Sequence, residues 1–250
     1  MHAGIIAAGW GQRLGGGPKA LVPVAGRALI DHVLDGLQAA GVDHVTCIVN
    51  EASKAVVGAV ASRGRGLEFD WIVETTPSSM HSFLVVLERL SRSGEPWHLM
   101  TTVDVICPPE TVRSFADRAG RLPEADVVLA LTDLVDDEKP LYAALKGSVS
   151  AHALGPASDV QPEAFRIRAL GADAAGSAHV TAGLYRVSPS ILRERQVALD
   201  RGYGALRQFL GHLLASGYGV YGLPIPPAVD VDRPADVGTA ERFLREWSRR

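Results

Sequence analysis

The chain opens on an apolar run that breaks into a glycine-rich turn carrying two basic residues. Residues 4–8 are apolar or glycine, and Gly9, Gly11, Arg13 and Lys19 follow soon after. Such a run predicts a β-strand, and the glycines after it free backbone N–H groups to approach phosphate oxygens. Arg13 adds a planar fork of donors and Lys19 adds a point charge. The chain is thereby constrained to begin with a strand and a phosphate-binding loop, and this combination indicates a nucleotide ligand.

Two better-known phosphate loops can be compared with this segment letter by letter. A dinucleotide-binding turn has the pattern G-x-G-x-x-G, but Leu14 stands at the third glycine position, where close packing of helix on strand needs a minimal side chain. This weakens the dinucleotide interpretation. A P-loop ends in Gly-Lys-Ser or Gly-Lys-Thr, but Lys19 follows Pro18 and precedes Ala20, so no hydroxyl is offered to Mg²⁺. The P-loop interpretation fails.

The same letters resemble the G-x-G-x-R-L…P-K signature of the sugar-1-phosphate nucleotidyltransferases. These enzymes make nucleotide sugars from a sugar 1-phosphate and a nucleoside triphosphate. The signature occupies residues 9–14 and 18–19, and the continuation over residues 20–30 is also similar to the family. A plain glycine-rich surface turn with solvated charges is the alternative interpretation. The resemblance implies that the loop binds the nucleotide through Ala8, Gly9, Gly11, Gln12 and Arg13, and that Arg13 and Lys19 are catalytic.

The composition is that of an ordinary globular enzyme. The 250 residues can bury a full core, and the net charge of −3 with a pI near 6.2 provides no basic field for wrapping nucleic acid. No apolar run reaches membrane-spanning length, and the first strand follows the initial methionine without a leader. We therefore expect a cytoplasmic protein without nucleic-acid or membrane partners. The oligomeric state is not determined by these features.

Strand-like and helix-like periods alternate along the chain, and this pattern predicts an α/β fold. We expect a three-layer α/β/α sandwich with a mostly parallel mixed sheet, which the resemblance makes a Rossmann-like nucleotide-diphospho-sugar transferase fold. Cys47 and Cys107 lie in apolar segments without ligand spacing and are expected in the core. Short alternating runs after residue 138 indicate antiparallel strands. The expected strands cover residues 44–49, 69–73, 97–106, 127–131, 142–146, 165–170, 180–187 and 220–224, and the expected helices cover 30–40, 53–62, 82–91, 108–121, 190–195, 205–216 and 234–249.

A single domain is the simplest organisation, because the sequence contains neither a repeat nor a low-complexity linker. Within residues 1–250 we expect a nucleotide-binding part over about 1–135 and a sugar-binding part over about 136–228. Residues 229–250 are expected to supply a metal-binding segment and the C-terminal helix.

Three aspartates are the candidate metal ligands. Asp104 stands at the end of an expected strand, where open α/β sheets hold their ligands. Asp230 and Asp232 are two residues apart and share one face if the segment is extended. Carboxylates of this kind suit Mg²⁺. The resemblance implies that Asp104 is a catalytic metal ligand, and it leaves open which of Asp230 and Asp232 completes the site. Capping of the last helix is the alternative role, which we expect for Asp236.

The resemblance places a sugar pocket on the segment 179–187. Thr181 and Gly183 are its expected sugar-binding residues, with an ordinary interior strand containing a bulge glycine as the alternative. The basic residue that contacts the sugar phosphate is not assigned by the motif. Its candidates are Lys139, Lys146, Arg166 and Arg168.

The base is expected to lie against residues 74–79, where Glu74, Ser78 and Ser79 are candidate contacts implied by the resemblance. An ionised glutamate only accepts hydrogen bonds. Glu74 therefore suits a base with amino or ring N–H donors, guanine best and cytosine or adenine next, so GTP is the expected substrate. A solvated glutamate at a strand end is the alternative.

The function expected from the sequence is Mg²⁺-dependent transfer of a nucleotidyl group from a nucleoside triphosphate to a sugar 1-phosphate, with release of pyrophosphate. This chemistry needs positioning and charge neutralisation more than a nucleophilic side chain. One alternative is a cytidylyltransferase-type enzyme of the same fold with a non-sugar phosphate or phosphonate acceptor. The other alternative is a regulatory protein that binds nucleotide without catalysis.

Overall fold

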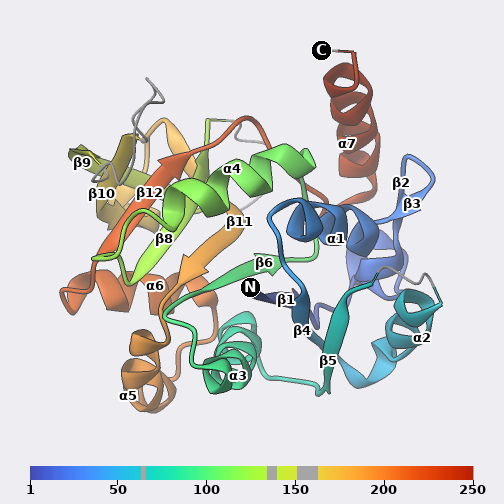
Figure 1. Cartoon of the computed structure of the whole chain (residues 1–250), viewed down its shortest axis with the longest axis horizontal. Helices are drawn as coiled ribbons and strands as arrows, with labels where there is room; N and C mark the ends of the chain where they lie inside the picture. The colour runs from blue at the N-terminus through green and yellow to red at the C-terminus, as the bar shows by residue number, and fades with distance from the viewer. Residues whose placement is uncertain (63–65, 134–139, 151–162, 250) are drawn as a thin grey trace.

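The computed structural model describes residues 1–62, 66–133, 140–150 and 163–249. Its centre is a mixed sheet with helices on both faces (Figure 1). The described residues form a nine-stranded sheet in the order β5-β4-β1-β6-β11-β8-β12-β10-β9. These strands are β1 (His2–Ala7), β4 (His44–Val49), β5 (Glu68–Val73), β6 (His98–Thr102), β8 (Val127–Thr132), β9 (Tyr142–Ser150), β10 (Glu163–Leu170), β11 (His179–Val187) and β12 (Val220–Pro224).

The strand directions match the expected mostly parallel mixed sheet. Neighbours β5, β4, β1 and β6 are parallel, and so are β8 and β12. The strand β11 is antiparallel to both β6 and β8, and β10 is antiparallel to both β12 and β9. Only β10 and β11 of this sheet therefore run against the others. The carboxyl ends of β1, β4 and β6 meet at one edge, where a parallel sheet holds ligands.

Helices cover the two faces of the sheet as separate apolar layers. Helices α1 (Leu29–Ala39), α2 (Ala55–Ala61) and α4 (Pro109–Ala119) pack on one face. Helices α3 (Ser79–Leu90), α5 (Arg195–Asp200) and α6 (Leu206–Ala215) pack on the other (Figure 1). The apolar residues of α3 recur at helical spacing, so Phe83 and Leu87 are both fully buried. Burial of each such side chain contributes about 1.5–3 kcal/mol. The three-layer arrangement expected from the sequence is thus confirmed.

A third apolar cluster joins the last helix to two short strand pairs. Helix α7 (Pro234–Trp247) lies beside the hairpin of β2 (Pro23–Val24) and β3 (Arg27–Ala28) (Figure 1). The second pair is β7 (Val105–Ile106) with β13 (Val229–Asp230), in which Asp230 is the register partner of Val105. The cluster is built from Val24, Leu29, Ile106, Val229, Val231 and Ala240. It fixes segments near residues 20, 105 and 230 next to one another.

Some elements differ from their expected bounds for local reasons. The strand expected over residues 97–106 is interrupted by a turn at 103–104, so Asp104 lies between β6 and β7. Helix α3 begins at Ser79, because the Ser78 side chain accepts from the His81 amide and caps it. The helix expected over 190–195 is a 3₁₀ turn, Pro189–Glu194, followed by α5. Each difference moves an element end by a few residues and leaves the topology unchanged.

The two cysteines are buried, as expected for core residues. Burial raises the pKa of Cys107 to about 12, with Asp230 and Glu110 adding to the shift. No helix of the described part of the chain is both long and apolar enough to cross a membrane.

Candidate active site

The glycine-rich turn follows β1 and is held by hydrogen bonds from the residue that comes directly after the neighbouring strand β4. Asn50, directly after β4, donates its amide Nδ2 to the carbonyl oxygens of Ala8 at 3.0 Å and Gly9 at 3.5 Å. Gly11 has a φ of +57°, and a Cβ there would lie 2.7 Å from the Gly17 carbonyl oxygen. Glycine is therefore required at position 11 both for the left-handed backbone and for the close approach. The loop folds back on itself and presents Lys19 at its end.

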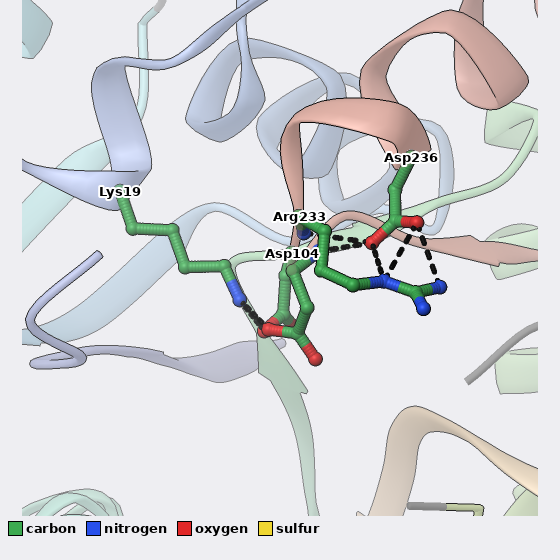
Figure 2. A network of polar contacts seen from close by, with 5 residues as sticks. Lys19, Asp104, Arg233 and Asp236 are labelled. Atoms are coloured by element: carbon green, nitrogen blue, oxygen red, sulfur yellow. Dashed lines mark hydrogen bonds and ion pairs between the residues drawn. The ribbon is translucent and has the colours of Figure 1, made fainter. Parts of the chain in front are cut away.

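Lys19 is the centre of the charged site. Its ammonium donates to Asp104 Oδ2 at 2.5 Å and also to Asp232 Oδ1 (Figure 2). The Lys19 side chain is 10% exposed. Two carboxylates from segments far apart in the sequence thus converge on one buried cation. We call Lys19, Asp104 and Asp232 the charged triad.

Lys19 and Asp104 stabilise each other in their charged forms. Burial by itself would lower the pKa of Lys19, but the charges and hydrogen bonds of Asp104 and Asp232 raise it well above its ordinary value. Burial would raise the pKa of Asp104, but the Lys19 charge and hydrogen bonds from Lys19 and Thr102 lower it. Opposite charges at this distance favour both ionised forms. Lys19 and Asp104 therefore form a charged pair at neutral pH.

Backbone hydrogen bonds at the end of β6 and at the start of α7 set the position of Asp232. The Val231 amide donates to the Asp104 carbonyl oxygen at 3.0 Å, which ties this segment to the end of β6. Asp236 Oδ2 accepts from the backbone amides of Asp232 and Arg233 at 3.0 and 2.7 Å. The Arg233 guanidinium also donates to Asp236, from Nη2 to Oδ1 at 2.9 Å (Figure 2). Burial would raise the pKa of Asp236, but these hydrogen bonds lower it. Asp236 thus has the capping role expected for it.

A pocket of about 340 Å³ opens beside the triad. It brings together Asp104, Asp230 and Asp232, the expected metal ligands, with Thr181 and Gly183, the expected sugar contacts. Gly183 has a φ of +62°, and a Cβ there would lie 2.6 Å from Thr102 Oγ1. It lies in a bulge of β11 between the paired residues Thr181 and Tyr185. The rest of the lining consists of Ser79, Thr102, Leu141, Tyr185, Ala205, Leu206, Arg207 and Leu210.

The expected nucleotide contacts lie in two places. Gly9, Gln12, Arg13 and Glu74 are exposed, the first three in the glycine-rich turn and Glu74 directly after β5. Ser79 is also exposed but lines the pocket, where its Oγ accepts from the Leu206 amide at 3.2 Å. Ser79 therefore connects the starts of α3 and α6. Its role as a base contact stays a prediction.

The candidates for the phosphate contact of the sugar do not line this pocket. Lys146, Arg166 and Arg168 line a second cavity of about 760 Å³ beside β9, β10 and α6. Lys139 lies outside the described residues. Arg207 is the basic residue that lines the pocket itself.

Sequence reasoning missed Asn50 and Arg207. Asn50 follows a parallel strand directly, so the rule that selected Asp104 would also have selected it. No comparable signal marks Arg207, because its place in the pocket depends on how α6 packs across α3.

The carboxylates of the pocket can be tested as ligands for Mg²⁺. Within residues 1–62, 66–133, 140–150 and 163–249, no cluster of three or more aspartates, glutamates, histidines or cysteines is arranged to hold a metal ion unaided. Mg²⁺, however, is usually bound by one or two carboxylates together with substrate phosphates and water. The three aspartates of the pocket are enough to supply those one or two carboxylates.

Comparison with known proteins gives the family. The MobA-like NTP transferase domain matches residues 3–180. A CMP-5'-(3-aminopropyl)phosphonate synthase of Streptomyces rubellomurinus is 30% identical over 78% of this chain and 29% of its own length. A bifunctional IPC transferase and DIPP synthase of Rubrobacter xylanophilus is 28% identical over 99% of this chain and 53% of its own length. The chain thus spans at most about half the length of these curated relatives.

Solved structures agree on the fold. A putative glucose-1-phosphate thymidylyltransferase from Bacillus anthracis superposes with a TM-score of 0.78 at 15% identity, covering 98% of this chain and 96% of the other. The inositol-1-phosphate CTP transferase from T. maritima gives 0.74 at 18% identity, with the same coverage. These similarities show the nucleotide-diphospho-sugar transferase fold. Because the domain match extends over well more than half of its residues, the chain belongs to the MobA-like NTP transferase family of nucleotidyltransferases.

Proposed function

We propose that the chain transfers a nucleotidyl group from a nucleoside triphosphate to an acceptor bearing a phosphate or phosphonate, with release of pyrophosphate. The observation that carries the proposal is the charged triad at the junction of the glycine-rich turn and the pocket. Lys19 touches Asp104 and Asp232, which both line the pocket. A cation and two carboxylates at this junction suit the exchange of phosphate oxygens between two anionic substrates.

In the proposed reaction an acceptor oxygen attacks the α-phosphorus, and the bond from that phosphorus to the bridging oxygen of pyrophosphate breaks. The turn holds the leaving pyrophosphate through the amides of residues 9–11 and through Arg13. Lys19 lies between the attacking group and the α-phosphate. Asp104 with Asp230 or Asp232 would hold Mg²⁺, which would neutralise phosphate charge when bound. The side chains orient and neutralise the reacting groups, and none becomes covalently attached.

Two acceptor classes remain, and the relatives favour the one without a sugar. The relative matched over 99% of this chain is a bifunctional IPC transferase and DIPP synthase, and the relative matched over 78% is named for a phosphonate, whereas a glucose-1-phosphate thymidylyltransferase matches 52% of the chain. The pocket is small, and Leu141, Leu206 and Leu210 line part of it. A compact phosphate or phosphonate is therefore our first candidate. A sugar 1-phosphate is the second candidate, because the motif of the turn and the Bacillus anthracis structure favour it.

The nucleotide we propose is CTP. The carboxylate of Glu74 suits a base that donates an amino group, and the sequence alone placed guanine before cytosine on this ground. Cytosine carries such an amino group, and CMP or CTP occurs in the names of two of the similar proteins. Glu74 is exposed at the end of β5, where a base can reach it.

Pyrophosphate release with the four nucleoside triphosphates and a panel of acceptors tests the proposal. The panel contains sugar 1-phosphates, inositol 1-phosphate and aminoalkylphosphonates, each with and without Mg²⁺. We expect CTP with a non-sugar acceptor to have the highest kcat/KM, and Glu74→Gln to change the ranking of the nucleotides. A ranking that the variant leaves unchanged would remove Glu74 from the base contact. Nucleotide binding without turnover on any acceptor would instead indicate a regulatory protein.

A further inference from the structure

The pocket beside the triad has a surplus of negative charge. Asp104, Asp230 and Asp232 line it, and among its described lining residues Arg207 is the basic one. An acceptor bearing a phosphate or phosphonate is itself an anion. Mg²⁺ held by the aspartates would offset part of their charge, and a cationic side chain that faces the acceptor would offset more of it. Lys19 is already bound to two of the carboxylates.

Arg207 is placed to be that cation. It is the second residue of α6, and its neighbour Leu206 is buried and anchored by the hydrogen bond from its amide to Ser79 Oγ. A basic residue in the first turn of a helix opposes the helix dipole. The helix dipole therefore gives no reason for a cation at this position. The positive end of the helix dipole and the Arg207 charge both attract an anion at this point.

Arg207 lines the pocket together with Tyr185, Asp104 and Asp230, and this places its side chain on the pocket side of α6. Burial raises the pKa of Tyr185, the charges of Asp230 and Asp104 raise it further, and Arg207 acts against them. Tyr185 lines the pocket together with these residues. The Arg207 guanidinium therefore shares one electrostatic environment with the carboxylates.

Three of the other basic candidates, Lys146, Arg166 and Arg168, line a different cavity. Lys146 and Arg166 are register partners on neighbouring strands and line the second cavity with Arg168. That cavity contains neither a triad member nor a residue of the glycine-rich turn.

We propose that Arg207 binds the phosphate or phosphonate group of the acceptor, so that one of its oxygens faces the α-phosphorus. This inference rests on the proposed function, and it defines the acceptor as a molecule with a terminal PO₃ group. A guanidinium can hold two oxygens of such a group and leave the third to attack. The new bond joins the third oxygen to the α-phosphorus, and the departing pyrophosphate takes the electron pair of the bond that breaks.

Steady-state kinetics on the whole chain tests the proposal. We expect Arg207→Gln to raise the KM for the acceptor by about 10-fold to 100-fold. The KM for CTP should stay unchanged, and Arg207→Lys should give an intermediate value because it keeps the charge but not the fork. Arg195→Gln is the matched control: this arginine of α5 lies 3.8 Å from Glu88 and is absent from the pocket lining. An equal rise in both KM values, or a rise with Arg168→Gln and none with Arg207→Gln, would overturn the proposal.

A binding measurement separates this inference from the proposed function. Calorimetry with methylphosphonate, in the presence of Mg²⁺ and a non-hydrolysable CTP analogue, needs no turnover. Binding to the wild type that is lost in Arg207→Gln and retained in Arg195→Gln supports Arg207, even if no acceptor in the panel is turned over. Equal binding to wild type and Arg207→Gln overturns the assignment, even if the enzyme is active.

Discussion

Two ionisable groups, Asp104 and His98, lie at opposite ends of strand β6, and their surroundings differ. Asp104 follows the strand and meets the Lys19 ammonium at 2.5 Å. His98 begins the strand, is fully buried, and has no hydrogen-bond partner for either ring nitrogen among the described residues. Glu95 is near, with its Oε2 3.5 Å from His98 Nδ1. One end of β6 therefore keeps its group charged and paired, and the other keeps its group neutral.

The difference separates a chemical role from a packing role. Burying a charge is costly unless a partner compensates it, and Lys19 from the glycine-rich turn is that partner for Asp104. Burial lowers the pKa of His98, Glu95 opposes this effect, and the net shift is downward. We therefore expect changes at the Asp104 end to affect turnover and changes at the His98 end to affect stability.

The largest effect is expected for Asp104→Asn. The substitution keeps the shape of the side chain and removes its charge, so turnover should fall by about 100-fold or more. Lys19 keeps Asp232 as a partner, so the fold should persist. The measurement is kcat for pyrophosphate release at saturating Mg²⁺, with circular dichroism for the fold and the exposed Asp117→Asn as control. Turnover near the wild-type value would remove Asp104 from the site.

Lys19→Ala should damage synthesis and its reverse, pyrophosphorolysis, to the same extent. Both directions share one transition state, and a group on the reacting phosphates must affect both. We expect a loss of about 10²-fold in each direction. Lys54→Ala is the control, since Lys54 pairs with Glu51 on the surface. If only a KM rose and kcat stayed intact, Lys19 would be a binding residue and not a catalytic one.

A smaller effect on kcat/KM is expected for Asn50→Leu, which changes the support of the glycine-rich turn. This change removes the donor that holds the carbonyl groups of Ala8 and Gly9 while roughly keeping the volume. Loss of these hydrogen bonds costs about 1–2 kcal/mol, which corresponds to about 10-fold in kcat/KM for the nucleotide. The KM for the acceptor should not change, because Asn50 is not part of the pocket lining. A change confined to thermal stability would make Asn50 a structural residue only.

Local features of the sequence were sufficient for the regular elements and the turn. The glycine at position 11 is required by its own backbone conformation, and Asp104 is marked by the strand before it. The convergence of the triad is different, because Asp232 reaches Lys19 only through the pairing of β13 with β7. No spacing in the sequence encodes that pairing.

The acceptor side was harder to predict for the same reason. Arg166 and Arg168 lie on a strand near the edge of the sheet, and sequence spacing does not say which strand occupies an edge. Arg207 reaches the pocket because α6 packs beside α3, a contact between segments more than a hundred residues apart. The motif of the turn could therefore identify the family, and the acceptor contact needed the packed structure.

The smallest effect is expected at the other end of β6 and concerns stability. A histidine whose pKa is lowered by folding takes up a proton more readily in the unfolded chain. Below the ordinary pKa of 6.5, His98 therefore takes up a proton in the unfolded chain before it does so in the folded chain. The stability contribution of neutral His98 is complete above this pH and falls as the pH drops, by at most about 1.4 kcal/mol per pH unit.

Urea unfolding between pH 7.5 and 5.5 measures this change in the free energy of unfolding. His98→Leu should flatten the pH dependence and leave kcat at pH 7.5 unchanged, whereas His179→Gln, at the start of β11, should keep the wild-type slope. Equal slopes in wild type and His98→Leu would show that His98 does not set the acid sensitivity, and the contrast between the two ends of β6 would then rest on Asp104 alone.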